Sequence, residues 1–282
     1  MKKILLLVSL LTILIATAQP QDSLFVWKSG LLVNKQSIKP ADMDSITFKR
    51  PTTIGINIAG PNITDIDGNV YASVTNCGQT WIQRNLNVSR YSDGTPIPQV
   101  TSPTDWTNLT TGAWCYYANN TANGPIYGKL YNWYAVAGIY DAASAANPAL
   151  RKKLAPTGWH VPSDGEWSNL INCLDPNADG GNTYPNIAGG KMKATGTIEA
   201  GTGLWASPNT EATNESGFTG LSGGWRWSGF ASIGNYSNWW SSTEFASTDA
   251  WSWIITNNTG TVNRGQDFTL KLFGLSVRCV RD

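Results

Sequence analysis

The spacing of apolar residues predicts an α-helix over residues 163–174. Apolar side chains recur there three and four positions apart and so share one helix face: Trp167, Leu170, Ile171 and Leu174. Ser163 and Glu166 form a capping-box pattern, in which each side chain accepts a hydrogen bond from a backbone N–H group that the helix leaves free. Pro176 favours an end to the helix at Asp175, because proline disfavours helical geometry in the residue before it.

The same spacing predicts a second helix over residues 127–137. Its apolar face would be formed by four residues: Leu130, Trp133, Tyr134 and Ala137. Gly138 follows as a helix stop signal. We therefore expect two helices in the central part of the chain.

Alternating apolar and polar residues predict strands on both sides of these helices. Residues 63–71 have the pattern of a hairpin around Asp67-Gly68, and strands are predicted at 250–255 and 275–280. Gly-Gly pairs between residues 180 and 224 predict a long irregular region. The pattern predicts an α+β domain with two helices, antiparallel strands and long irregular loops.

The first residues have the form of an export signal. Residues 1–18 combine Lys2 and Lys3, an apolar run and a small-residue exit at Ala16-Thr17-Ala18, which is typical of a secretory signal peptide. No cysteine follows, so the attachment site of a bacterial lipoprotein is missing. No later apolar run approaches the ~18 residues of a membrane span. We expect a secreted or cell-surface protein whose mature chain does not insert into the membrane.

Residues 19–58 are predicted to form a short β segment and a linker. Three short apolar runs at 24–27, 31–33 and 46–48 have the composition of strands. The main domain is then expected at 59–282. Its charge is balanced, because the chain has 20 Lys and Arg against 19 Asp and Glu. This balance excludes the basic surface that binding to nucleic acid requires.

The predicted export of the protein affects the expected state of its four cysteines. Cys77, Cys115, Cys173 and Cys279 are widely spaced and form no C-x-x-C motif. In an oxidising compartment they favour one or two structural disulfides over a zinc site. Three pairings are possible, and we favour those that close long loops onto Cys279.

Several motifs resemble one family of exported bacterial proteins, the Fibrobacter succinogenes major paralogous domain. The match covers about residues 60 to 282, and the motifs that carry it are, in chain order, residues 127–136, 158–167, 216–218, 239–244 and 274–282. The likeness extends more distantly to the formylglycine-generating, sulfatase-modifying superfamily and to C-type-lectin-like folds. The resemblance implies a C-type-lectin-like domain and does not itself imply an activity.

Catalysis has few candidate groups in this sequence. His160 is the only histidine, and it directly precedes the capped helix, where a structural role is the simpler interpretation. The cysteines show no match that carries over to the redox site of the formylglycine-generating enzymes. We expect no catalytic residues, and an extracellular enzyme derived from that scaffold is the alternative hypothesis.

A calcium site has one weak candidate, and we otherwise expect no cofactor. Asp175, Asn177, Asp179 and Gly180 fit the first half of an EF-hand loop, but position 12 is Asn186 instead of the bidentate Glu. An Asn/Asp/Gly turn is the simpler interpretation. The sugar-binding triplets of calcium-dependent C-type lectins, Glu-Pro-Asn and Gln-Pro-Asp, are also absent from the sequence.

The aromatic residues of the last third are the strongest functional signal. Rings among Ser, Asn and Gly combine flat apolar faces with hydrogen-bonding groups, which is the mixture that a sugar needs. The alternative is that many of these rings fill the core. The candidate ligand-binding residues are Trp225, Arg226, Trp227, Tyr236, Asn238, Trp239, Asn263 and Arg264. The first hypothesis is a binding or adhesion protein for an extracellular glycan or a surface protein, and a structural surface subunit is a further alternative.

Overall fold

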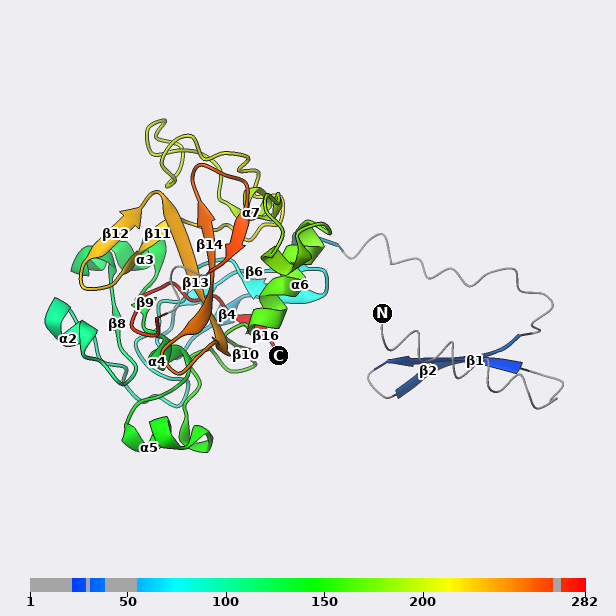
Figure 1. Cartoon of the computed structure of the whole chain (residues 1–282), viewed down its shortest axis with the longest axis horizontal. Coiled ribbons are helices and arrows are strands. Elements are labelled where there is room, and N and C mark those ends of the chain that lie inside the picture. The colour runs from blue at the N-terminus through cyan, green and yellow to red at the C-terminus, as the bar shows by residue number, and fades with distance from the viewer. Residues whose placement is uncertain (1–21, 29–30, 39–54, 266–269) are drawn as a thin grey trace. The chain divides into compact units, whose positions relative to one another are not determined.

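The computed structural model describes residues 22–28, 31–38, 55–265 and 270–282, which form parts of two compact units divided between Thr52 and Thr53 (Figure 1). In the first unit, β1 (Asp22–Lys28) and β2 (Leu31–Ile38) pair as an antiparallel hairpin. These strands include the predicted runs at 24–27 and 31–33. The signal peptide predicted at 1–18 and the strand predicted at 46–48 lie outside the described residues.

The second unit contains two five-stranded sheets. In the first sheet the order is β10-β16-β7-β6-β3, and all pairs are antiparallel. Its strands are β3 (Ile58–Ala59), β6 (Ser73–Asn76), β7 (Gln79–Ile82), β10 (Trp159–His160) and β16 (Val280–Arg281). The last strand, β16, thus lies between β7, from the beginning of the unit, and β10.

The second sheet has the order β12-β11-β13-β14-β15. Only the β11–β13 pair is parallel among its described pairs. Its strands are β11 (Gly223–Arg226), β12 (Phe230–Ile233), β13 (Tyr236–Glu244), β14 (Ala250–Thr256) and β15 (Val262–Arg264). Two small antiparallel pairs complete the strands: β4 (Ile63–Thr64) with β5 (Val70–Tyr71), and β8 (Trp114–Cys115) with β9 (Leu130–Tyr131).

The helices are few and short. They are α2 (Pro103–Thr107), α3 (Gly124–Tyr127), α4 (Trp133–Val136), α5 (Ala142–Ala146), α6 (Asp164–Leu174) and α7 (Ala188–Met192). Within the described ranges, only α6 is longer than five residues, and no helix is long and apolar enough to cross a membrane. The fold is therefore a mixed α/β fold with mostly antiparallel sheets, which confirms the broad prediction.

The predicted helix at 163–174 is confirmed as α6. The Ser163 hydroxyl accepts from the Glu166 backbone N–H at 3.3 Å, and the Glu166 carboxylate accepts from the Ser163 N–H at 2.8 Å. The four apolar residues of the predicted face are all buried. The predicted hairpin at 63–71 is confirmed as well, and the Asp65 carboxylate accepts from the backbone N–H groups of Asp67 and Asn69, each at 2.9 Å.

The predicted helix at 127–137 is wrong. The chain there forms the end of α3, the strand β9 and the single turn α4. Gly128 has a φ of +74°, and a Cβ at this position would lie 2.7 Å from the Leu86 carbonyl oxygen. Asn132 then caps α4 and also accepts from the Ala113 N–H at 2.9 Å. Contacts with distant segments thus replace the local helical hydrogen bonds.

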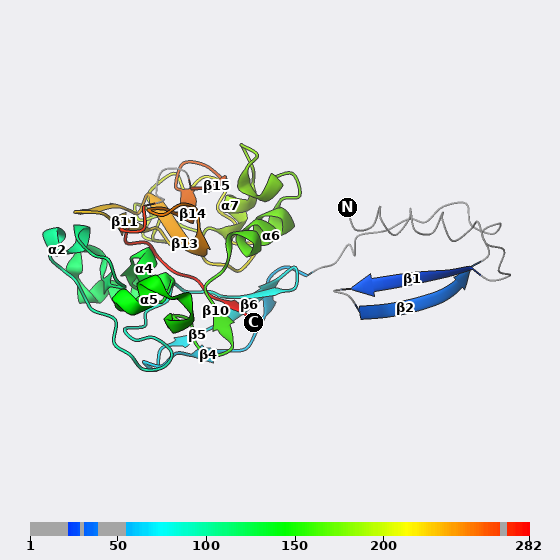
Figure 2. The ribbon, with the colours of Figure 1, turned by 60° about the horizontal axis from the view of Figure 1, so that its bottom comes forward.

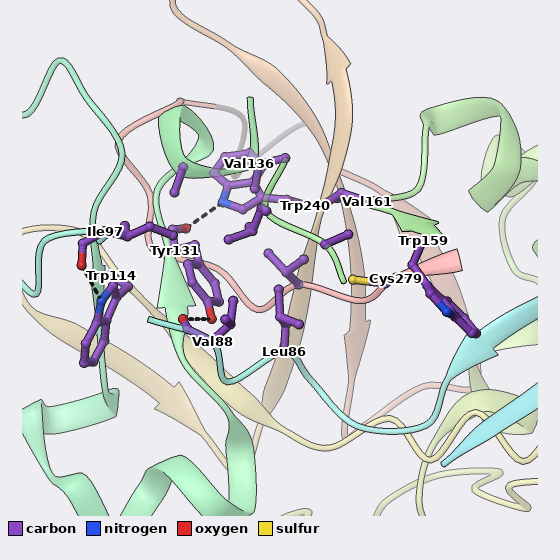
Figure 3. Packing of buried hydrophobic residues seen from close by; sticks show 14 of the residues in the cluster. Leu86, Val88, Ile97, Trp114, Tyr131, Val136, Trp159, Val161, Trp240 and Cys279 are labelled. Atoms are coloured by element: carbon purple, nitrogen blue, oxygen red, sulfur yellow. Dashed lines mark hydrogen bonds between the residues drawn. The ribbon is translucent and has the colours of Figure 1, made fainter. Parts of the chain in front are cut away.

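Indole rings fill much of the interior. In one cluster Trp167 packs against Trp81 and Trp253, with ring centroids 4.8 and 6.0 Å apart. A second cluster, shown in Figure 3, surrounds Trp240, whose Nε1 donates to the Tyr131 carbonyl at 2.8 Å. Core filling is therefore the main role of the tryptophans in the described residues.

One disulfide joins Cys77, in the turn between β6 and β7, to Cys173 in α6. Cys115 and Cys279 are unpaired and buried. The prediction of a disulfide is confirmed, but the preference for pairs onto Cys279 is wrong. Cys279 lies in the cluster around Trp240, whereas Cys115 lies in a separate cluster with Trp106.

Candidate functional site

A groove of about 580 Å³ opens beside β15, the edge strand of the second sheet. Figure 2 shows β13, β14 and β15 side by side, with α6 and α7 next to them. These strands, together with residues at and just after the 3₁₀ turn Asp179–Gly181, line the groove: Gly181, Asn182, Tyr184, Tyr236, Trp251, Ile254, Thr256, Asn263 and Arg264. This is a sheet edge with aromatic, amide and guanidinium groups in one hollow.

Arg264 is fixed in the groove on two sides. Its Nε donates to one carboxylate oxygen of Asp164 at 2.9 Å, and its Nη2 pairs with the other oxygen. The guanidinium also lies over the Trp251 ring, 3.6 Å from the ring centre. A two-point arginine–carboxylate pair fixes orientation as well as distance, so the guanidinium is held as a rigid part of the wall.

The position of Asp164 follows from the capped helix. Asp164 is the first residue of α6, where the helix dipole favours a negative charge. Its backbone N–H donates to the Thr243 hydroxyl at 3.0 Å, which ties the start of α6 to β13. The capping signal that defines α6 in the sequence therefore also places the partner of Arg264.

Three aromatic rings face the groove. Tyr184 is 65% exposed, and Tyr236 and Trp251 are half-buried. Amide groups come from Asn263 on β15 and from Asn182, whose Nδ2 donates to the Asp179 carbonyl at 2.8 Å. The groove therefore offers apolar ring surface next to donors and acceptors of hydrogen bonds.

The structure brings three of the eight predicted ligand-binding residues into this groove: Tyr236, Asn263 and Arg264. Trp225 and Trp227 are half-buried elsewhere and pack against Phe273, with ring centroids 5.6 and 5.0 Å apart. The predicted surface is therefore not one continuous site.

The other three predicted residues are buried, so the prediction that they face a ligand is wrong. Arg226 donates to the carbonyls of Val100, Thr101 and Ser102 at 2.6 to 3.0 Å. Trp239 donates from Nε1 to the Asn85 side chain at 2.9 Å, and Asn238 is enclosed in the central strand β13. All three residues lie on β11 or β13, and their buried side chains serve the core.

Sequence reasoning missed Tyr184, Trp251 and Asn182 as site residues. Trp251 and Trp253 lie two positions apart on one strand, so their rings share one face. Only Trp253 is fully buried, with 0% exposed, whereas Trp251 is half-buried. The signal that could have found Tyr184 is its place in a turn-rich segment just after Gly180-Gly181. An aromatic residue in such a segment has few neighbours to bury it.

The calcium candidate is a turn in the structure. One oxygen of Asp175 accepts from the Asn177 backbone N–H and the other from the Ile187 N–H, both at 3.0 Å. Asn177 and Asp179 are exposed. Across the described ranges, no three His, Cys, Asp or Glu side chains come together as metal ligands.

His160 lies outside the groove and bridges two carboxylates. Its Nδ1 is 2.7 Å from Asp282, and its Nε2 is 2.8 Å from Glu166. Burial alone would lower the pKa of His160, but the hydrogen bonds to both carboxylates outweigh burial and raise it. This histidine therefore joins β10 to α6 through its hydrogen bond to Glu166.

The two unpaired thiols lack the properties of redox-active groups. Burial raises the pKa of Cys115 to about 11 and that of Cys279 still further above its ordinary value. A reactive thiol needs a lowered pKa and access to solvent. These thiols pack in separate parts of the core.

The fold and the groove together define a disulfide-bonded, mixed α/β domain with an aromatic, amide-lined surface hollow. Residues 74–281 match the model of the Fibrobacter succinogenes major domain, and the chain belongs to that family. The family predicted from the sequence motifs is thereby confirmed. No curated protein and no solved structure matches the chain.

Proposed function

We propose that this protein is an exported binding protein and that the groove beside β15 binds carbohydrate. The observation that carries the proposal is the meeting of Tyr184, Tyr236 and the Trp251–Arg264 pair with the amides of Asn182 and Asn263 in one hollow. Sugars present C–H faces that pack on rings and hydroxyls that need donors and acceptors. Both requirements are met by the lining residues.

The size and rigidity of the groove support this proposal. Its volume of about 580 Å³ lies within the ~300–1,000 Å³ of ordinary small-ligand sites. Arg264 is already oriented by Asp164 and Trp251, so little side-chain freedom remains to be lost on binding. The groove side chains make the contacts in this proposal, without a calcium ion.

The C-type-lectin-like fold and the location outside the cell are parts of the same proposal. The mixed fold with long loops between its strands supports the first, and the export signal predicted at 1–18 together with the Cys77–Cys173 disulfide supports the second. A protein partner instead of a glycan is the alternative, and glycan binding that depends on the groove residues would speak against it.

The test is a glycan array followed by titration calorimetry on the purified chain. We expect binding to at least one glycan class, and we expect Tyr184→Ala to weaken it by about tenfold or more, as loss of a central aromatic contact does. Tyr140→Ala is the matched control, because Tyr140 is 36% exposed and does not line the groove. Equal losses in both variants, or the absence of glycan binding, would refute the proposal.

A further inference from the structure

The charge of the groove is compensated within the protein. Arg264 is the only lining residue in the described part of the chain that carries a charge at neutral pH, and two of its guanidinium nitrogens are bonded to Asp164. The Asp164 carboxylate already compensates the charge of Arg264, so a carboxylated or sulfated sugar would bring a second negative charge beside it. The site therefore favours a ligand without charge.

Aromatic surface continues beyond the groove. Phe245, in the turn between β13 and β14, is 57% exposed, and its ring centroid lies 4.6 Å from that of Trp251. The turn is held by hydrogen bonds from the backbone N–H groups of Phe245 and Ala246 to the Asp249 carbonyl, at 2.9 and 3.0 Å. Phe245 is thus an exposed ring in a defined position, in direct contact with a ring that lines the groove.

The surroundings of Phe245 extend this surface. Leu270, which is 37% exposed, forms a β-bridge with Asp249 on the same turn. Single exposed apolar residues are common on protein surfaces and need no explanation. Here, however, Phe245 continues the ring surface of Trp251.

We propose that the groove takes a neutral oligosaccharide chain of several sugars, whose first sugars occupy the hollow and whose following sugars lie over Phe245. This inference rests on the proposed function, since it specifies the glycan that the same site binds. A single sugar would be held by the groove residues alone. A longer chain adds contact with the exposed ring of Phe245.

The experiment compares chain lengths and charge. Calorimetry is done with di- and hexasaccharides of glucose, mannose and xylose, and with hexasaccharides of galacturonic acid as the anionic probe. We expect a hexasaccharide to bind at least fivefold more tightly than the disaccharide of the same sugar, as removal of about 40 Å² of apolar contact area from water would produce. We expect weaker binding of the galacturonic acid chain.

The Phe245→Ala variant separates this inference from the proposed function. We expect this variant to bind the disaccharide as the unchanged protein does and to lose the gain for the hexasaccharide. Leu150→Ala is the control, because Leu150 is 46% exposed and lies outside the groove. Equal affinity for both lengths, an unaffected length dependence in Phe245→Ala, or preferred binding of the anionic chain would overturn the inference while sugar binding itself stands. Binding of no glycan at all would overturn the proposed function and the inference with it.

Discussion

Removal of the Cys77–Cys173 disulfide should lower the stability of the second unit strongly. The two cysteines are 96 positions apart in the sequence. In the chain-entropy model, opening a closed loop of about 100 residues returns roughly 4.7 kcal/mol of conformational entropy to the unfolded state at 25 °C. Each kcal/mol shifts the unfolding temperature by about 2–4 °C in a domain of this size, so we expect the double variant Cys77→Ser, Cys173→Ser to unfold roughly 10–20 °C lower.

Thermal unfolding followed by tryptophan fluorescence, with and without a reducing agent, measures this effect. When the unchanged protein is reduced, its unfolding temperature should fall to that of the double variant. The unfolding temperature of the double variant itself should not change on reduction. Cys115→Ala is the control, because Cys115 is buried and unpaired, so this variant should keep its sensitivity to reduction. A shift below about 4 °C, or a response to reduction in the double variant, would refute the entropic argument.

Two further predictions concern ionic contacts of α6. The hydrogen bonds of His160 raise its pKa above 6.5, so its contribution to stability is complete below that pH and is lost as the pH rises through the folded-state pKa. Burial would raise the pKa of Glu166, but hydrogen bonds from Ser163 and His160 outweigh burial and hold the pKa below 4.5. The contribution of Glu166 to stability is therefore complete above pH 4.5 and is lost as the pH falls through the folded-state pKa. The stabilisation from these two residues should therefore be greatest between pH 4.5 and 6.5, and the decline of the unfolding temperature just above pH 6.5 should be smaller in His160→Gln than in the unchanged protein; an unchanged decline would contradict this assignment. Asp164→Ala should lower the free energy of unfolding, measured with a denaturant, by about 1–3 kcal/mol, because the Arg264 side chain is only 26% exposed and loses its partner. An unchanged free energy of unfolding would show that the pair is solvated.

Local signals predicted the elements that depend on neighbouring residues. The capping box of Ser163 and Glu166 and the Asp-Gly turn at residues 67–68 involve side chains within a few positions, and both appear as predicted. The pattern at residues 127–137 is equally regular, but its backbone pairs with Trp114 and Leu275, which are distant in sequence. Periodicity alone does not reveal such a competing partner.

The sequence also did not predict which individual side chains are buried. Arg226 and Trp227 are adjacent and similar in context, yet Arg226 is 0% exposed while Trp227 is half-buried. The difference arises because Arg226 satisfies three carbonyl groups of the segment 100–102, which is brought there by the fold. In the same way, Cys173 pairs with Cys77 because α6 packs near the β6–β7 turn, and the lengths of the possible loops do not indicate this.

The groove lies beside β14, where one face of the strand carries a buried ring at Trp253 and a half-buried ring at Trp251. Trp251 and Trp253 are two positions apart on β14 and so point to the same side of the sheet. Trp253 is covered by Gly181, where a Cβ would lie 2.6 Å from the indole ring, and by Trp167 of α6. Trp251 instead meets the Asp164–Arg264 pair at the first turn of α6, where the apolar face of the helix has not yet begun. The start of one capped helix therefore decides which indole fills the core and which one lines the groove.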